Sequence, residues 1–152
     1  MSVKALRFIT SKEAQVEHAP WGKHWWMSKP GFTDSKQLMF VRVTMPPGAA
    51  HQFHYHPERE EILYVLDGVG EQWVHTSKKS LKAGESAFIP KKTVHGIYNA
   101  SMKPLTFLAI LSPATAKGPF LVDCYRDEPW CCLREPFEYR KFDPKTGKTL
   151  TK

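Results

Sequence analysis

Residues 48–68, GAAHQFHYHPEREEILYVLDG, contain the pattern that decides the fold of this chain. His54 and His56 are two residues apart, so on a β-strand both imidazoles lie on the same face. Pro57 ends that strand, and the apolar run after it can return antiparallel and bring Glu61 to the same interior. We therefore expect two strands joined by a short turn, with two nitrogen donors and one carboxylate converging between them.

Other short strands are expected around this pair. In residues 37–45, QLMFVRVTM, the alternation puts Val41 and Val43 on one face and Arg42 and Thr44 on the other. The runs VGEQWVHT, AFIP, VHGIYN and PLTFLAILS are equally short and are bounded by Pro, Gly or Asp. Twelve Pro and nine Gly leave few windows for a long helix. The pattern predicts an all-β chain whose sandwich or barrel is formed by about residues 37–112.

The length of 152 residues predicts a single domain, 1–152. Hydrophobic residues make up 41% and charged residues 24%, which is typical of a folded chain and not of intrinsic disorder. The flanks 1–36 and 113–152 are rich in Pro, Lys and Trp, and we expect extended N- and C-terminal arms there that cover the barrel or a partner subunit. A homodimer in which these arms pack on the partner would cover their aromatic residues.

Cysteine usage and charge limit the compartment and the partners. Three Cys without a CxxC pair indicate free thiols, so we expect a cytoplasmic location. No membrane partner is expected, because no run of eighteen apolar residues occurs. The net charge of +7 is spread along the chain and accompanies no nucleic-acid-binding motif. We expect no nucleic-acid partner and a weak attraction to anionic small molecules.

His95, on the run VHGIYN, is a fourth candidate ligand beside His54, His56 and Glu61. Three imidazoles and a carboxylate suit Fe(II), Mn(II), Ni(II), Zn(II) or Cu(II), and they differ from the Cys-rich ligand set of structural zinc. Without an ion, burying the carboxylate in a small barrel would cost several kcal/mol. The sequence predicts one divalent transition metal per chain, with coordination positions left open for a small ligand.

These residues resemble the two sequence motifs of the cupin superfamily, whose fold is a small jelly-roll barrel. The first motif is matched in every element, by Gly48, His54, His56, Glu61 and Gly68. The second motif is matched in all elements but one, by Gly84, Pro90, His95 and Asn99. The exception is Lys92, which stands where the family has Gly. The turn before His95 must therefore use another conformation or hold a side chain in the left-handed region.

The resemblance implies that His54, His56, Glu61 and His95 are the metal ligands. Glu60 is a rival for the carboxylate position, because the family also permits a gap of three residues there. The six residues between Glu61 and Gly68 match the family spacing and favour Glu61.

The reaction is left open, because cupins include dioxygenases, decarboxylases, isomerases, lyases and proteins that only bind a ligand. We expect an enzyme, either a dioxygenase or an isomerase or lyase, that acts on a small oxygen-rich carboxylate or sugar-like molecule by O2 activation or Lewis-acid catalysis. The alternative is a non-catalytic small-molecule binder or sensor. Arg42 and Thr44 are candidate substrate-binding residues if their face is the lumen, and Asn99 is a third. His51 is expected at the rim, and His24 is expected to be structural or exposed.

Overall fold

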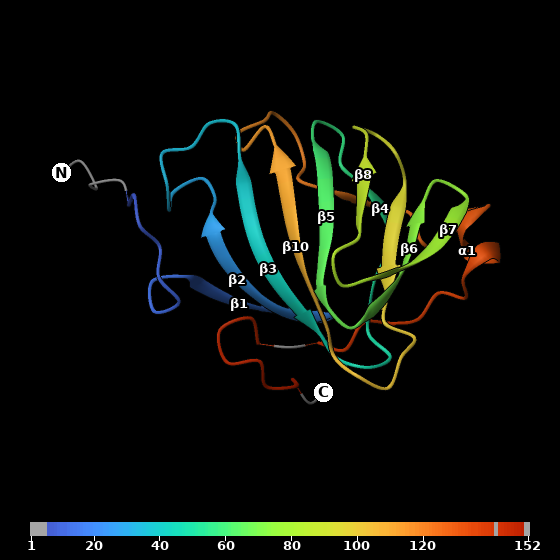
Figure 1. Cartoon of the computed structure of the whole chain (residues 1–152). Helices are drawn as coiled ribbons and strands as arrows, with labels where there is room; N and C mark the ends of the chain where they lie inside the picture. Colours follow the sequence, from blue (N-terminus) through green and yellow to red (C-terminus); the bar gives the residue numbers. More distant parts are fainter. Residues whose placement is uncertain (1–5, 142, 151–152) are drawn as a thin grey trace.

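A computed structural model describes residues 6–141 and 143–150 of the chain. In this part of the chain, eleven strands form two antiparallel sheets that face each other (Figure 1). The first sheet has the order β1 (Gln15–Ala19), β2 (Gly22–Ser28), β3 (Met39–Met45), β10 (Leu105–Ser112), β5 (Glu60–Asp67) and β8 (Ser86–Ile89). The second sheet has the order β11 (Val122–Asp123), β4 (Ala50–Tyr55), β9 (His95–Tyr98), β6 (Val69–Val74) and β7 (Ser77–Lys82). This nearly all-β arrangement confirms the predicted jelly-roll class.

The main core lies between the two sheets. Buried and half-buried residues alternate along the whole of β3 and β10, because successive side chains of a strand point to opposite faces. The buried face of β3 carries Met39, Val41, Val43 and Met45. Removing these apolar side chains from water fixes the orientation of the strand.

The N-terminal flank departs from the expected arm. Residues 15–28 form a hairpin whose second strand, β2, pairs antiparallel with β3 and extends the first sheet. A Cβ at Gly22 would lie 2.9 Å from the Thr44 carbonyl oxygen, so a glycine permits this close packing. The prediction of an extended arm is wrong for these residues, because the hairpin satisfies the free backbone edge of β3.

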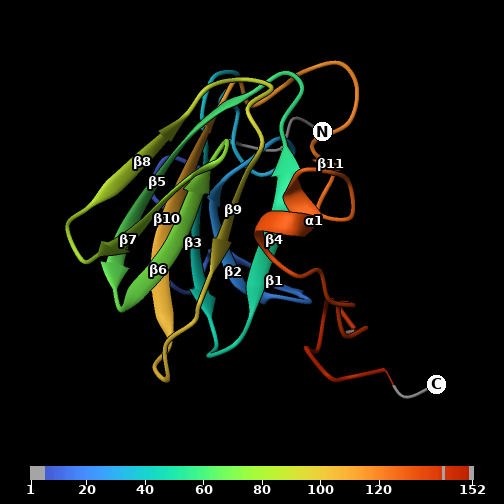
Figure 2. The ribbon, with the colours of Figure 1, turned by 90° about the vertical axis from the view of Figure 1, so that its right-hand side faces the viewer.

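The C-terminal flank packs on the outer face of the second sheet (Figure 2). Trp130, in the four-residue helix α1 (Trp130–Leu133), is buried with its ring centroid 5.5 Å from that of Phe53 on β4. The Gln52 side chain donates to the Phe137 carbonyl and accepts from the Phe137 N–H. This segment therefore covers its own barrel. None of the helices among the described residues has the length and apolarity of a membrane span.

Candidate metal centre

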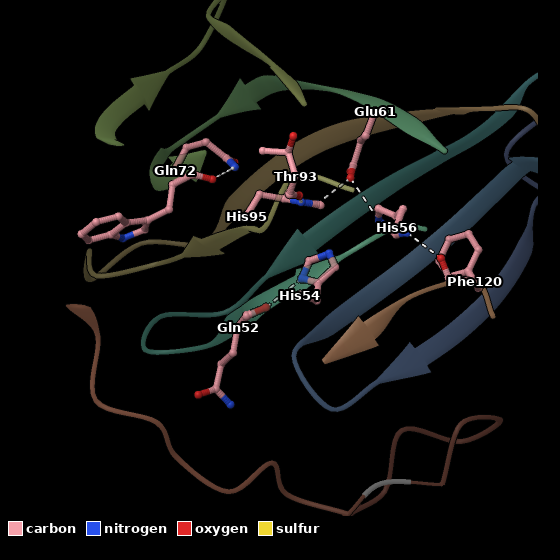
Figure 3. Close-up of polar contacts among 9 residues, drawn as sticks. Gln52, His54, His56, Glu61, Gln72, Thr93, His95 and Phe120 are labelled. Atoms are coloured by element: carbon pink, nitrogen blue, oxygen red, sulfur yellow. Dashed lines mark hydrogen bonds and ion pairs between the residues drawn. The ribbon is translucent and has the colours of Figure 1, made fainter. Parts of the chain in front are cut away.

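The structure brings the four predicted ligands together between the sheets (Figure 3). His54 lies on β4, His56 directly follows it, Glu61 is on β5 and His95 begins β9. One donor atom from each residue lies within 4.8 Å of all the others. Each side chain is buried, with at most 7% of the residue exposed. Glu60 is exposed on the opposite face of β5, so the structure agrees with the spacing argument for Glu61.

Backbone carbonyls orient all three imidazoles. The Nδ1–H groups of His54, His56 and His95 donate to the carbonyls of Gln52 (2.7 Å), Phe120 (2.7 Å) and Thr93 (2.9 Å). Because a carbonyl can only accept, Nδ1 carries the proton in each neutral ring. Each Nε2 is left as a lone pair directed at the centre, which is the arrangement that second-shell partners impose on metal-binding histidines.

These lone pairs need a cation. The His95 Nε2 lies 2.9 Å and the His56 Nε2 3.3 Å from the same Glu61 Oε2, so acceptors face each other at hydrogen-bonding distance. The His54 Nε2 is buried and has no hydrogen-bond partner among the described residues. A divalent ion at the centre would satisfy all four donors at once, and their mixed nitrogen and oxygen chemistry fits a transition metal.

Burial and proximity keep the donors in their metal-binding forms. Burial opposes ionisation of Glu61, but hydrogen bonding and positive charge at His56 and His95 outweigh burial and hold the pKa of Glu61 far below its ordinary value, and a divalent ion in the same place would favour the carboxylate in the same way. Burial and the neighbouring imidazoles lower the pKa of His54 well below its ordinary value. Both groups are therefore deprotonated at neutral pH, as metal binding requires.

A cavity of about 330 Å³ opens beside the four donors. Its lining is mainly apolar and aromatic, with side chains from both sheets, and it includes Trp21, Trp26, Met39, Val41, Val43, Leu63, Ile97, Phe107, Phe120 and Leu121. Small-molecule sites are typically concave and apolar with a few convergent polar groups. The cavity can therefore admit a small ligand to the open side of the centre.

The three predicted substrate-binding residues do not line this cavity. Arg42 and Thr44 lie on the outer face of β3, where the Arg42 guanidinium stacks 4.5 Å from the Trp25 ring centroid. The interpretation of that face as the lumen is contradicted, because the apolar Val41 face is the one buried. Asn99 is buried elsewhere and donates to the carbonyls of Met45 and Lys103, which ties two turns together.

His51 is a cavity residue that the strand alternation misses. It lies three positions from His54, which on a regular strand would place the two on opposite faces. The pairing of β4 with β9 shifts register between His51 and His54, and this irregularity turns both rings to the cavity. Trp21 and His24, from the β1–β2 hairpin, also line the cavity. No signal in the sequence placed that hairpin at the barrel.

The turn before His95 uses the second of the two conformations expected for it. Lys92 has φ 65°, in the left-handed region that favours glycine. Its N–H donates to the His56 carbonyl at 2.9 Å, so the turn links two of the candidate ligands.

Comparisons with known proteins agree with this geometry. Residues 41–111 match the family model described as Cupin domain. The oxalate-binding protein of Thermotoga maritima is 34% identical over 79 residues, which are 51% of this chain and 64% of that protein. The oxalate decarboxylase OxdC of Bacillus subtilis is 30% identical over 94 residues, 59% of this chain and 24% of that enzyme. The chain thus spans less than two thirds of the length of each of these relatives.

Solved structures give the same result. An RmlC-like cupin from Shewanella frigidimarina superposes with a TM-score of 0.63 at 25% identity, covering 72% of this chain and 93% of that one. A structure of the B. subtilis oxalate decarboxylase described for its Mn(II) centres gives a TM-score of 0.63 at 25% identity, covering 74% of this chain and 30% of that enzyme. With two matched motifs, a jelly-roll fold and four convergent donors, the chain belongs to the cupin superfamily.

Proposed function

We propose that the chain is a metal-dependent enzyme that acts on a small molecule bound through oxygen atoms to a divalent ion. The observation that carries this proposal is the convergence of His54, His56, Glu61 and His95 on one point with a mainly apolar cavity beside it. A bound ion would supply Lewis-acid polarisation or, for Fe or Mn, access to O2 chemistry. The Mn(II) centres of the similar Bacillus enzyme support manganese as the first ion to test.

The chain's own residues hold the site in place. The carbonyls of Gln52, Phe120 and Thr93 fix the imidazoles, so the site is organised before a ligand arrives. Phe120 and Leu121, in the segment before β11, form part of the cavity wall. The ligand's oxygen head, a carboxylate or a vicinal pair of sugar-like oxygens, would occupy the open coordination positions.

A non-catalytic binder is the second candidate. It is favoured by the similarity to the oxalate-binding protein of Thermotoga maritima. Among the described residues that line the cavity, the only side chains that could act as a general acid or base are the histidines, Glu61 and Glu17. Turnover separates the two candidates, because a binder would take up metal and ligand without consuming the ligand.

We also propose that the chain works in the cytoplasm as a homodimer. The three cysteines are free, and Cys124 is buried in its own core, which is consistent with a reducing compartment. The dimer is supported by an apolar row on the outer face of β5 and β8, which consists of Ile62, Tyr64, Leu66 and Phe88.

Metal content tests the proposed centre. After reconstitution with Mn(II), Fe(II), Ni(II) or Zn(II), elemental analysis should find close to one ion per chain, and His54→Ala should lose most of it. His75→Asn is the matched control, because His75 is an exposed imidazole outside the site and Asn tolerates its positive φ of 53°. Each loaded form is then incubated with small carboxylates and sugars while O2 uptake and product release are followed. A protein that takes up no ion, or His54→Ala with full occupancy, contradicts the proposal.

A further inference from the structure

We infer that the cavity selects a ligand with a single chelating oxygen head on a flat, uncharged, apolar body, and that it discriminates against dianions such as oxalate. The inference rests on the proposed metal centre, because the chelating head needs the ion. It concerns the rest of the cavity, where this chain's own side chains decide which body can follow the head inside.

The charge of the lining opposes a second anionic group. Among the described residues that line the cavity, the only formally charged side chains with histidines neutral are the carboxylates Glu17 and Glu61. Glu61 is buried, whereas Glu17 is exposed at the mouth, where water screens its charge. A divalent ion beside Glu61 would leave the buried site with one positive charge. A monoanion would neutralise that charge, whereas a dianion would leave one negative charge with no cationic side chain in the described lining to pair with it.

Two guanidinium groups lie outside the cavity lining. Arg42 stacks on Trp25 on the outer face of the first sheet. Arg59 donates from Nη2 to the Ala114 carbonyl and lies 5.0 Å from the centroid of the Phe120 ring, whereas its Nε and Nη1 are buried without a hydrogen-bond partner among the described residues. Neither residue is part of the cavity lining. A bidentate arginine clamp for a free carboxylate is therefore absent from the described wall.

The wall beside the centre is aromatic. The Trp21 indole stacks on the His51 ring with centroids 4.1 Å apart and planes 8° apart. His51 in turn stacks on His54, with centroids 3.7 Å apart and planes 21° apart. This aromatic column, Trp21–His51–His54, runs from the β1–β2 turn to a candidate ligand of the ion. Because the rings cover each other's faces, a planar ligand body would pack against their edges or on the outer face of Trp21.

The facing sheet completes an apolar slot. Met39, Val41 and Val43 of β3 line the same cavity from the first sheet, opposite the second-sheet residues His51 and His54. The volume of about 330 Å³ is at the lower end of the range of small-molecule pockets, roughly 300–1,000 Å³. The space suits a body of about one ring. Polyhydroxylated sugars would leave most of their hydroxyl groups without partners on these walls.

Glu17 marks the polar limit of the slot. Its Oε2 accepts the Trp26 indole N–H at 2.8 Å, which holds the carboxylate at the wall that both residues line. A negative charge at this position repels a second carboxylate of a ligand whose first is bound to the ion. It can accept a hydrogen bond from a hydroxyl or amino group on the apolar body.

Two small oxygen-donor probes separate the alternatives. At neutral pH salicylate carries one negative charge, with its carboxylate and neighbouring hydroxyl on one flat ring, whereas oxalate is a dianion without an apolar body. Both are titrated calorimetrically into the Co(II)-loaded protein, and the visible spectrum of cobalt reports whether the probe reaches the ion. We expect salicylate to bind at least about tenfold more tightly than oxalate, although oxalate's two charges attract a free ion more strongly.

Two variants assign the selectivity to named residues. Trp21→Ala should weaken salicylate binding about tenfold and change oxalate binding less than about twofold, because the stacking wall is lost and the ion site is kept. Trp25→Ala, on the outer face beside Arg42, is the control and should change neither. Glu17→Gln keeps an acceptor for Trp26 and should strengthen oxalate binding several-fold.

The outcomes distinguish this inference from the function on which it rests. A protein that takes up no ion refutes both. A cobalt-loaded protein that binds oxalate as tightly as salicylate, or does not bind salicylate, refutes the inference and leaves the metal centre standing. Equal loss of both probes in Trp21→Ala with an unchanged cobalt spectrum also contradicts the role of the stacking wall.

Discussion

Lys92 has a strained backbone conformation in the turn that carries the candidate ligands. Its left-handed backbone, with φ 65°, lets its N–H reach the His56 carbonyl and positions the start of β9. A residue with a Cβ pays roughly 1–2 kcal/mol in this region. The ligand-bearing turn is thus held by its hydrogen bond against a local conformational cost.

Replacing Lys92 by glycine should relieve this cost. The greater entropy of glycine in the unfolded chain offsets part of this gain, so we expect Lys92→Gly to raise the free energy of unfolding by about 0.5–1 kcal/mol. Urea denaturation of the two proteins measures the difference. Lys91→Gly is the matched control, since Lys91 is exposed and lacks the positive φ, and it should be neutral or destabilising. A destabilised Lys92→Gly would show that the side chain contributes more than the strain costs.

His24 makes the stability of the metal-free protein depend on pH. Burial lowers the pKa of His24 to about 4 and outweighs the opposing effect of Glu17, while His18 lowers the pKa slightly further. Between the unfolded value near 6.5 and this folded value, the unfolded chain binds more protons, so stability falls as the pH falls. From pH 7 to pH 5 this residue alone should cost about 2 kcal/mol.

The variant His24→Gln isolates this contribution. Urea denaturation of the chelator-treated proteins at pH 7 and pH 5 should show a smaller loss of stability for the variant, by about 2 kcal/mol. The absolute stability of the variant does not affect this comparison, because only the change with pH is used. Equal pH dependence in both proteins would contradict the buried, neutral state of His24.

At the scale of elements, the centre joins the two sheets. β5, which carries Glu61, belongs to the first sheet, whereas β4 and β9, which carry or adjoin the three histidines, belong to the second. An ion bound by all four side chains would therefore link β5 to β4 and β9, which belong to the other sheet and do not pair with β5. The apolar core between the sheets does not depend on that link.

Metal should raise stability without being needed for folding. A ligand that binds only the native state adds about 2.7 kcal/mol at a free concentration of one hundred times Kd. We expect the chelator-treated protein to melt at a lower temperature but in one cooperative transition, as a single domain with its own core would. Calorimetry with and without Zn(II) measures the shift, and His54→Ala should show none. Unfolding of the metal-free protein at room temperature would contradict this expectation.

At the scale of the whole molecule, three tryptophans of the flanks are covered by their own chain. Trp21 and Trp26 line the chain's own cavity, and Trp130 is buried in its own core. Phe8 of the N-terminal flank is 85% exposed. A group of exposed apolar residues lies on the outer face of the first sheet. On β5 and β8 it consists of Ile62, Tyr64, Leu66 and Phe88, which are 38–56% exposed. The register pairs Ile62 with Phe88, so these side chains form one continuous row.

We expect a second copy of the chain to cover this row. A two-fold dimer would pair the row with itself and bury more than about 1,200 Å² in total. Light scattering at micromolar concentration should give twice the chain mass of 17.5 kDa, and Ile62→Lys with Phe88→Glu should give the monomer. Met102→Glu, at a 90% exposed residue outside the row, is the control and should stay dimeric. A wild-type monomer at this concentration would contradict the prediction.

The sequence by itself determined the all-β class and the residues that converge as candidate ligands. Spacing sufficed for the histidines because a strand has a period of two, so His54 and His56 must share a face. The resemblance to the cupin motifs favoured Glu61 over Glu60, because six residues separate Glu61 from Gly68. The cost of burying a carboxylate among imidazoles then pointed to a metal. The same resemblance left two conformations open for the turn at Lys92, and the structure has the left-handed one.

Only the tertiary structure decided which face of β3 is the lumen, that His51 turns inward, and that the β1–β2 hairpin roofs the cavity. Alternation defines two faces but does not say which is inside, and here the burial of Val41 and Val43 sends Arg42 outward. A register shift between His51 and His54 changes the face to which a side chain points, and no clear pattern in the sequence indicates it. The ligand's neighbours come from strands far apart in the chain, so the composition of the cavity depends on packing that no local pattern contains.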